Sequence, residues 1–169
     1  MVSSPSQAAS QAVRKLLRDL GRQYDIHRGL RPFSDNKSIF SLILFFDYKC
    51  CYCHVSLRDK QWDKDHLEPI NKDHAGLHAW GNIAPSCKKC NNQRLNQDWA
   101  QFLRTKTKDE EDFITRKAKI EKYINKYNYS LNPMQKERIK MLANDLQTSV
   151  FSFVSRQIDM KLKEGSGLF

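Results

Sequence analysis

Two pairs of cysteines constrain this chain more than any other feature of its sequence. Each pair has the spacing C-x-x-C: Cys50 and Cys53 form the first pair, and Cys87 and Cys90 form the second. A C-x-x-C segment can turn two thiolates toward one ion, and two such segments complete the tetrahedral four-sulfur set that Zn²⁺ prefers. Because four cysteines leave no position open for water, we expect this zinc to stabilise the fold rather than to take part in a reaction.

Disulfide bonds are the alternative interpretation of these cysteines. The chain holds five cysteines, an odd number, and its first residues lack the basic and then apolar pattern of a secretory signal. We therefore expect a cytoplasmic protein whose cysteines are reduced. The fifth cysteine, Cys51, would give the less usual spacing C-x-C, so we interpret it as a small packing residue. His54 is a weaker alternative for one of the four ligands.

The composition suggests a globular protein with a polyanionic partner. Hydrophobic residues make up 40% of the 169 residues, and the longest apolar stretch, residues 39–46, is too short to span a membrane. Lys and Arg number 29 against 19 Asp and Glu, which gives a formal net charge of +10. A basic surface favours nucleic acid as the partner, but many basic proteins bind none, so the charge alone does not decide the function.

Before the cysteine region, the sequence predicts a basic amphipathic helix. It would run from Pro5 to about Leu20 and end at Gly21, and a second, apolar helix would follow over about residues 38–46. A solvated helix that only packs on the core would show the same pattern, and this alternative stays open. The basic residues that we name as candidate nucleic-acid contacts are Arg14, Lys15 and Arg18.

After the cysteine region, three more helices are predicted. They would cover about residues 98–104, 107–127 and 133–163, the second opened by a capping box of Thr107 and Glu110. Apolar residues recur at helical spacing along the last helix, so this face must pack against something. It would cover the chain's own core or, alternatively, a dimer partner or another protein.

A second pattern of polar residues lies between and just after the cysteine pairs. It consists of Asp65-His66, then Asn82, then Asn91 directly after Cys90. Together with the cysteines, this order resembles the HNH endonuclease family in its ββα-metal form with a four-cysteine zinc. The spacing His66-x15-Asn82-x8-Asn91 fits that family closely, and the resemblance covers roughly residues 38–98.

The resemblance implies a role for each residue of this pattern. His66 would be the general base, and Asp65 and Asn91 would ligate a catalytic divalent metal ion. Asn82 would hold the loop and orient the histidine. The positions that we expect to contact phosphate in this part of the chain are Arg94, where the family usually carries Lys or Arg, and the neighbouring Lys88 and Lys89.

The chemistry of phosphodiester hydrolysis agrees with these roles. The reaction needs an activated water, in-line attack and neutralisation of the leaving oxygen. A neutral imidazole can take a proton from water near pH 7, and Mg²⁺ or Mn²⁺ held by oxygen ligands can neutralise the leaving oxygen. Neighbouring side chains on a strand point to opposite faces, so Asp65 and His66 would need a bulge or a strand end to reach one phosphate.

Other residues near the motif receive simpler interpretations. His74 and His78 are expected to be solvated or to pack within the loop, and Asp63 and Glu68 are expected to face solvent. The aromatic residues of this region should pack around the small core rather than stack on bases: Trp62 and Trp80.

Together these patterns predict an α+β fold that is mainly α, a small zinc-bound ββα-metal unit with flanking N- and C-terminal helices. Residues 1–37 would form the basic helix and loop, 38–104 the nuclease core, and 105–169 the C-terminal helical region. Within the core, a β-hairpin of about residues 54–69 would lead through a loop into a helix that starts near Asn91. Such a unit is too small to bury much apolar surface, so the zinc and the flanking helices must stabilise it.

The predicted function is a DNA endonuclease that depends on Mg²⁺ or Mn²⁺. Analogy with the family suggests a bacterial or phage restriction or defence system as its setting. One alternative is a zinc-stabilised nucleic-acid-binding module without catalysis, and the intact Asp65, His66, Asn82 and Asn91 argue against it. A second alternative is an RNA-cleaving toxin nuclease, since a basic charge suits DNA and RNA equally.

Overall fold

Six helices and one two-stranded sheet make up the part of the chain that the structure describes. The computed structural model describes residues 4–33 and 36–163. The class is α+β and mainly α, as the sequence predicted. None of the helices in the described ranges has both the length and the apolar composition needed to cross a membrane. In chain order, the elements are α1 (Pro5–His27), α2 (Asn36–Phe45), β1 (Trp62–His66), β2 (Ile83–Cys87), α3 (Lys88–Arg94), α4 (Trp99–Arg104), α5 (Glu110–Lys126) and α6 (Pro133–Lys163).

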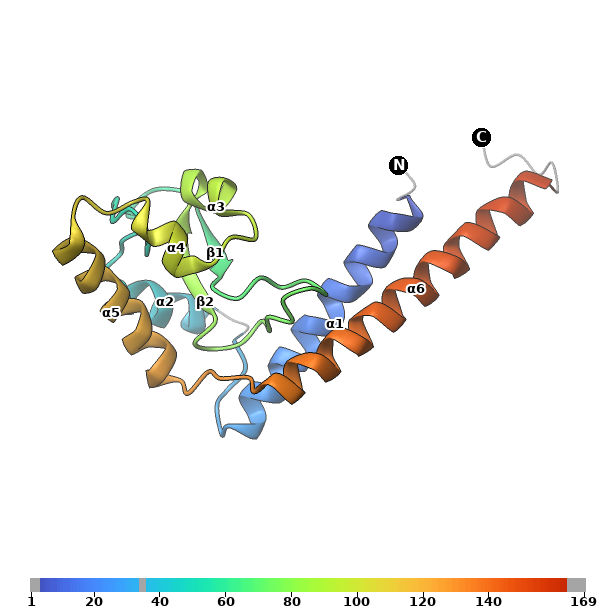
Figure 1. Cartoon of the computed structure of the whole chain (residues 1–169), viewed down its shortest axis with the longest axis horizontal. Helices are drawn as coiled ribbons and strands as arrows, with labels where there is room; N and C mark the ends of the chain where they lie inside the picture. Colours follow the sequence, from blue (N-terminus) through green and yellow to red (C-terminus); the bar gives the residue numbers. More distant parts are fainter. Residues whose placement is uncertain (1–3, 34–35, 164–169) are drawn as a thin grey trace.

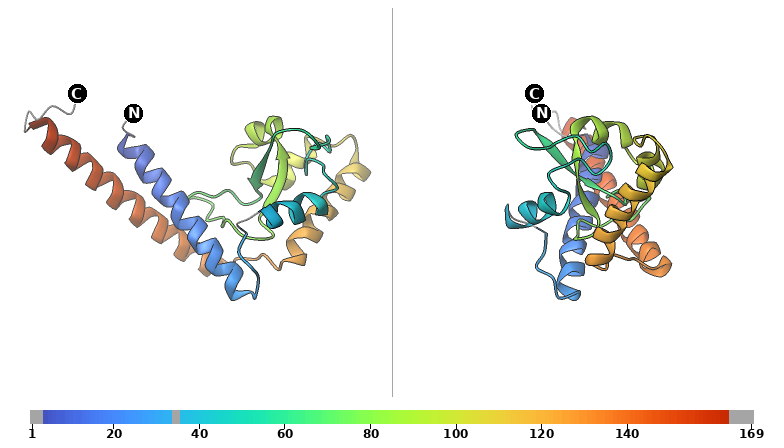
Figure 2. Two further views of the ribbon diagram at one scale, coloured as in Figure 1. Left: turned by 180° about the vertical axis from the view of Figure 1, so that it is seen from behind. Right: turned by 90° about the vertical axis from the view of Figure 1, so that its left-hand side faces the viewer.

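The elements form two parts that differ in shape (Figure 1). The first, which we call the lobe, covers residues 36–126 and holds the sheet with α2, α3, α4 and α5. The second, which we call the arm, is the antiparallel pair of α1 and α6, which lie side by side and extend away from the lobe. Figure 2 shows the same pairing from behind, with the start of α1 and the end of α6 at the far end of the arm.

The sheet differs from the predicted hairpin of residues 54–69. Strand β1 pairs antiparallel with β2, from Trp62 opposite Cys87 to His66 opposite Ile83, so its partner lies beyond a long loop of residues 67–82. Residues 49–56 make only an isolated bridge, between Lys49 and Ser56. The prediction was wrong because it joined neighbouring segments, whereas the apolar stretch that fits beside β1 is the buried strand β2. Helix α3 follows β2 at once and starts at Lys88, so Asn91 lies within it rather than at its start.

Helix α1 passes through Gly21, where the sequence predicted its end. An added Cβ at Gly21 would lie only 2.4 Å from the backbone oxygen of His78. This glycine therefore allows the loop of residues 67–82 to approach the helix closely, and it does not stop the helix. The helix ends instead at His27, with Arg28 as its C-cap.

Two apolar cores correspond to the two parts of the molecule. The core of the lobe is formed by α2, the first cysteine pair, the sheet, α4 and α5, and its fully buried members include Leu42, Tyr52, Ile83, Leu103 and Tyr123. The second core joins the arm to the loop of residues 67–82. It consists of Val13, Leu17, Leu77, Ala79, Tyr129, Leu131 and Ala143.

The last two helices start close to their predicted positions. The N-cap of α5 is Asp109, whose carboxylate accepts a hydrogen bond from the backbone N–H of Asp112 at 2.8 Å. The expected capping box of Thr107 is absent, because the Thr107 hydroxyl donates to the carbonyl of Arg104 at 3.0 Å. Helix α6 starts at Pro133 as predicted, and Asn132 caps it by accepting from the backbone N–H of Gln135 at 2.8 Å.

Helix α6 covers the chain's own core with only one of its sides. Ala143 is buried in the second core, whereas Leu142 is 53% exposed and Phe153 is 60% exposed. Apolar residues therefore occupy more of the α6 surface than the contact with α1 buries.

Candidate active site and metal site

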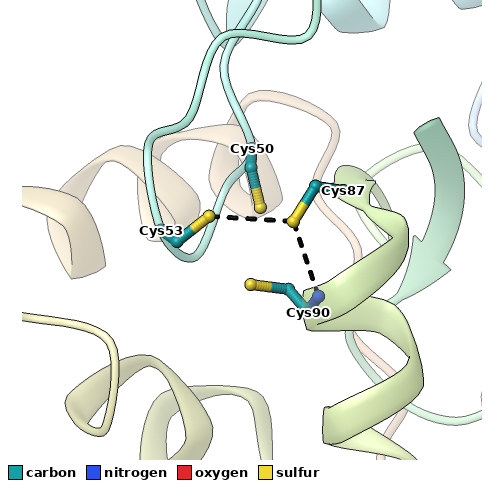
Figure 3. Close-up of side chains that lie close together, drawn as sticks. All are labelled: Cys50, Cys53, Cys87 and Cys90. Carbon is teal, nitrogen blue, oxygen red and sulfur yellow. Dashed lines mark hydrogen bonds between the residues drawn. The ribbon is translucent and has the colours of Figure 1, made fainter. Parts of the chain in front are cut away.

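The four cysteines of the two C-x-x-C pairs converge on one point between the first pair and the start of α3. The Sγ atoms of Cys50, Cys53, Cys87 and Cys90 all lie within 4.8 Å of one another, positioned to bind a metal ion. Figure 3 shows the four side chains turned toward a common centre. All five cysteines are free thiols in the structure.

Backbone hydrogen bonds shape the two cysteine pairs. In the first pair, the N–H of His54 donates to the carbonyl of Cys50 at 3.0 Å, and the N–H of Cys51 donates to Pro85 in β2 at 2.9 Å. In the second pair, Cys87 ends β2 and caps α3, with its sulfur accepting from the N–H of Cys90. The metal site thus ties the first pair to the β2–α3 junction. Cys51 lies outside the site and is 2% exposed, and burial raises the pKa of its thiol, as expected of a packing residue.

One cleft brings together the three residues to which the sequence assigned the chemistry. It has a volume of about 410 Å³, and Asp65, His66 and Asn91 all line it. Arg14 and Arg18 of α1 line the same cleft, so the arm contributes its wall. Asp65 and His66 are neighbours at the end of β1, where the chain turns into the loop, which is the strand end that the chemistry required.

His66 makes a contact that the sequence did not indicate. Its Nε2 lies 2.9 Å from Nδ1 of His78, which comes from the loop of residues 67–82. Burial lowers the pKa of His66 to about 3, with further contributions from His78 and the positive charge of Arg18. His78 was expected to be solvated or to pack within the loop. No spacing rule could have found it, because its place beside His66 depends on the path of the whole loop.

Arg94 does not have the predicted contact with phosphate. Its side chain is fully buried, and its Nε donates to Oδ2 of Asp65 at 3.1 Å and to the hydroxyl of Tyr52 at 3.0 Å. Its other nitrogens donate to the carbonyls of His66 and Leu67. The guanidinium is therefore buried inside the lobe, where it fixes the end of β1, and it is not exposed to a ligand.

Asp65 is held by the same network. It is 8% exposed, and its Oδ2 also accepts a hydrogen bond from the hydroxyl of Tyr52 at 2.6 Å. Burial raises the pKa of Asp65, and the charge of Arg94 opposes this shift. The Tyr52 and Arg94 contacts both go to Oδ2, so neither of them occupies Oδ1.

Asn82 closes the loop of residues 67–82. Its side chain is fully buried, and Oδ1 accepts from the N–H of Glu68 at 2.7 Å. Its Nδ2 donates to the carbonyls of Glu68 and Leu77, at 3.0 Å and 2.8 Å. One side chain therefore bonds the first residues of the loop to the segment that carries His78.

Two acidic residues that were expected to face solvent are instead used in contacts. Asp63 is half-buried and accepts from Nδ2 of Asn91 at 3.1 Å, which leaves Oδ1 of Asn91 as the atom that can ligate a metal. Glu68 pairs with Lys136 of α6 and accepts from the hydroxyl of Tyr129 at 3.2 Å. The latter contacts join the loop to the arm.

The remaining predicted site residues lie on the surface. Arg14, Lys15 and Arg18 are exposed on α1, and Lys15 pairs with Asp19 at 2.8 Å. Trp80 packs as expected, stacked on Tyr127 with ring centroids 4.7 Å apart. The two lysines of the second cysteine pair are exposed at the start of α3: Lys88 and Lys89.

A short antiparallel strand pair, a helix directly after it and a four-cysteine site lie together in one segment of the chain. Residues 50–97 match the family model described as HNH endonuclease. The matched segment holds both cysteine pairs together with Asp65, His66, Asn82 and Asn91, and a match to this family suggests nuclease activity in general. Comparison with curated proteins and with solved structures gave no match.

Proposed function

We propose that this protein is a metal-dependent endonuclease that hydrolyses phosphodiester bonds in DNA, with His66 as the general base. The observation that carries the proposal is the cleft of about 410 Å³ in which Asp65, His66 and Asn91 meet. A base and two oxygen donors in one cleft supply the groups that water activation and charge neutralisation require. The same cleft is lined by Arg14 and Arg18, whose charges suit a phosphate group.

His66 has the protonation state that a general base needs. Burial keeps the imidazole neutral near pH 7, so one ring nitrogen carries a lone pair. In the proposed step this lone pair takes the proton of a water molecule. The water oxygen then bonds to phosphorus, and the bond from phosphorus to the leaving sugar oxygen breaks. Hydrogen bonds from Arg94 to the carbonyls of His66 and Leu67 hold the backbone of the base in place.

Two side chains of the cleft fit a hard divalent cation. Oδ1 of Asp65 and Oδ1 of Asn91 would hold it, and carboxylate and amide oxygens are ligands that Mg²⁺ and Mn²⁺ accept. Asp63 supports this assignment, because its contact with Nδ2 of Asn91 fixes which atom of the amide is left. When bound, the ion supplies positive charge that neutralises the leaving oxygen.

For the four-cysteine site we propose structural Zn²⁺. The sulfurs of Cys53 and Cys87 lie 3.7 Å apart. A tetrahedral site with Zn–S bonds of about 2.3 Å requires sulfur–sulfur distances of about 3.8 Å. The distance therefore fits zinc. The site joins the first cysteine pair to the junction of β2 and α3, which fits a role in stabilising the fold.

The basic side of α1 is proposed as the binding surface for the DNA backbone. Arg14 and Arg18 line both the cleft and a neighbouring groove of about 510 Å³, which also contains Lys15 and Arg22. Residues one helical turn apart on one helix can follow successive phosphates. Lys88 and Lys89 stay predicted contacts on the lobe.

The biological setting and the protein partner are also proposals. The exposed apolar residues of α6, among them Phe151 and Phe153, suit a dimer contact or a partner protein. By analogy with the family, we propose a bacterial or phage restriction or defence system as the setting, with the partner as another protein of that system.

Cleavage of supercoiled plasmid tests the proposal. Purified protein is incubated with the plasmid and Mg²⁺ or Mn²⁺, in parallel with His66→Ala and with an RNA substrate. We expect nicked or linear DNA from the wild type and a loss of about 100-fold or more in His66→Ala with its metal content intact. Preferential cleavage of RNA would support the toxin alternative, and binding without cleavage of either would support the non-catalytic module.

A further inference from the structure

His78 is partly buried and lies beside the proposed base, His66, but has no role in the hydrolysis as proposed. Its Nδ1 lies 2.9 Å from Nε2 of His66, and the two rings have centroids 5.1 Å apart. An imidazole has two nitrogens, and in the neutral form one carries the proton while the other carries the lone pair. The partner at one nitrogen therefore decides what the other nitrogen can do.

We propose that His78 is a positioning residue that selects the tautomer of His66. Nδ1 of His78 accepts a hydrogen bond from the Nε2–H of His66, and Nδ1 of His66 keeps its lone pair for the water. The opposite arrangement, in which His78 donates, would place the proton of His66 on Nδ1 and block the base. This inference rests on the proposed function of His66.

The pair also stabilises the product of the proton transfer. When Nδ1 of His66 takes the proton of water, the ring becomes an imidazolium. Its Nε2–H then donates a charge-assisted hydrogen bond to His78, which is stronger than the bond between two neutral rings. His78 can accept because burial, together with the charges of Arg18 and Lys64, lowers its pKa to about 4 and keeps it neutral.

The arm holds His78 in position. The backbone N–H of His78 donates to the carbonyl of Leu17 in α1 at 3.4 Å, and Gly21 allows the closest approach of the helix to His78. The rings of Phe33 and His78 pack edge to face, with centroids 5.6 Å apart. Asp25 of α1 fixes this surrounding by accepting from the N–H of Phe33 and from the N–H of Trp80, both at 3.1 Å.

Three substitutions of His78 separate positioning from packing. The amide of His78→Asn lies close to the position of Nδ1, that of His78→Gln reaches the position of Nε2, and His78→Leu has no polar atom. We expect His78→Leu and His78→Gln to lower the single-turnover cleavage rate about 10- to 100-fold, with DNA binding unchanged. His78→Asn should restore the rate to within a few-fold of the wild type.

Two outcomes of this series overturn the inference. His78→Leu that cuts at the wild-type rate shows that His66 needs no partner. Asn, Gln and Leu variants that lose activity equally show that His78 only packs. A wild type that cuts nothing contradicts the proposed function instead, so the two failures are distinguishable.

The tautomer of His66 can be read without any variant or any activity. Long-range ¹H–¹⁵N NMR spectra of the wild type, loaded with zinc but without Mg²⁺, distinguish a protonated ring nitrogen from an unprotonated one. We expect the proton of His66 on Nε2. A proton on Nδ1 would overturn the inference, whatever the variants do.

Discussion

The lobe and the arm hold the same site by different physical means. The lobe is small, and polar anchors fix it: four cysteines around one point and the buried Arg94–Asp65 pair. The helices of the arm meet through small and apolar residues such as Ala9, Val13 and Ala143. The arm also has a buried ion pair, Asp25 with Arg28, at the end of α1. A short strand pair cannot rigidly hold a base by itself. The site is therefore supported from two sides, by the cysteine site and the Arg94–Asp65 pair in the lobe, and by apolar packing and the contacts of Asp25 in the arm.

The loop of residues 67–82 is where the two kinds of support meet. Asn82 and Arg94 bond it from the lobe, whereas the hydroxyl of Tyr129, in the segment that leads into α6, accepts from the N–H of Leu77 at 3.1 Å. His66 lies at one end of this loop, and His78 lies within it. Substitutions in the lobe and substitutions in the arm should therefore have different effects on stability and cleavage.

Loss of the metal from the four-cysteine site should have the largest effect and should be confined to the lobe. Structural zinc contributes on the order of 10 kcal/mol in small domains. In the lobe it ties the first cysteine pair to the β2–α3 junction. Chelation, or Cys90→Ser, should abolish cleavage and the near-UV circular dichroism of the lobe. Most of the helical signal should remain, since α1 and α6 do not contact the site. Near-UV spectra unchanged after complete removal of the metal would contradict a structural role.

Breaking the buried ion pair of the lobe should have the next largest effect. Arg94→Ala leaves Asp65 buried without its partner, which costs about 3–5 kcal/mol in comparable pairs. The matched control is Arg104→Ala, which removes an exposed pair with Glu110 and should cost less than about 1 kcal/mol. Urea unfolding of the metal-loaded proteins measures both. Equal losses would show that Arg94 is no anchor.

A methyl group at the contact between arm and loop tests the support from the arm. Gly21→Ala would stabilise an isolated helix by about 1 kcal/mol, but here the new Cβ would lie 2.4 Å from the oxygen of His78. We expect lower stability and slower cleavage, with the metal content unchanged. Ser10→Ala, at an exposed position of the same helix, is the control and should change neither. A more stable and fully active Gly21→Ala would mean that the arm does not position the loop.

Neutralising the basic side of the arm should weaken binding without disturbing the lobe. Each of Arg14→Gln and Arg18→Gln should reduce the slope of log K against log salt by about one if the residue contacts a phosphate. Lys122→Gln, an exposed change of the same charge on α5, is the control. The salt dependence of DNA binding in EDTA gives the slopes. Slopes that match the control would move the binding surface away from α1.

The smallest expected effect is a change in the acid sensitivity of the fold. The pKa of His78 is about 4 in the folded protein against an ordinary value of 6.5, so the unfolded chain binds a proton first as the pH falls. Above about pH 6.5 His78 is neutral in both states, and the folded protein has its full stability. Between about pH 6.5 and 4 the unfolded chain binds the proton and the folded protein does not, so stability is lost as the pH falls. The melting temperature of His78→Asn should therefore fall less steeply across this range than that of the wild type. Parallel curves would show that His78 is not held neutral.

The sequence predicted what local patterns can specify. The helices with strong periodicity were found, and the two C-x-x-C pairs predicted that four particular cysteines meet, because the spacing itself folds each pair. What failed depended on contacts between distant segments. Gly21 lies inside helix α1, where its lack of a side chain lets the loop of residues 67–82 pack closely. Strand β1 pairs with β2 rather than with a neighbouring segment. Arg94 is buried where it pairs with the buried carboxylate of Asp65, and the spacing of the two residues in the sequence does not predict this pair.

The most direct test of the central claim measures binding and cleavage on the same samples of wild type and His66→Ala. Both proteins are loaded with zinc, DNA affinity is measured in EDTA, and single-turnover cleavage is started with Mg²⁺ or Mn²⁺. We predict affinities within about twofold and a cleavage rate about 100-fold or more lower in the variant. Equal cleavage rates would contradict the assignment of His66 as the base.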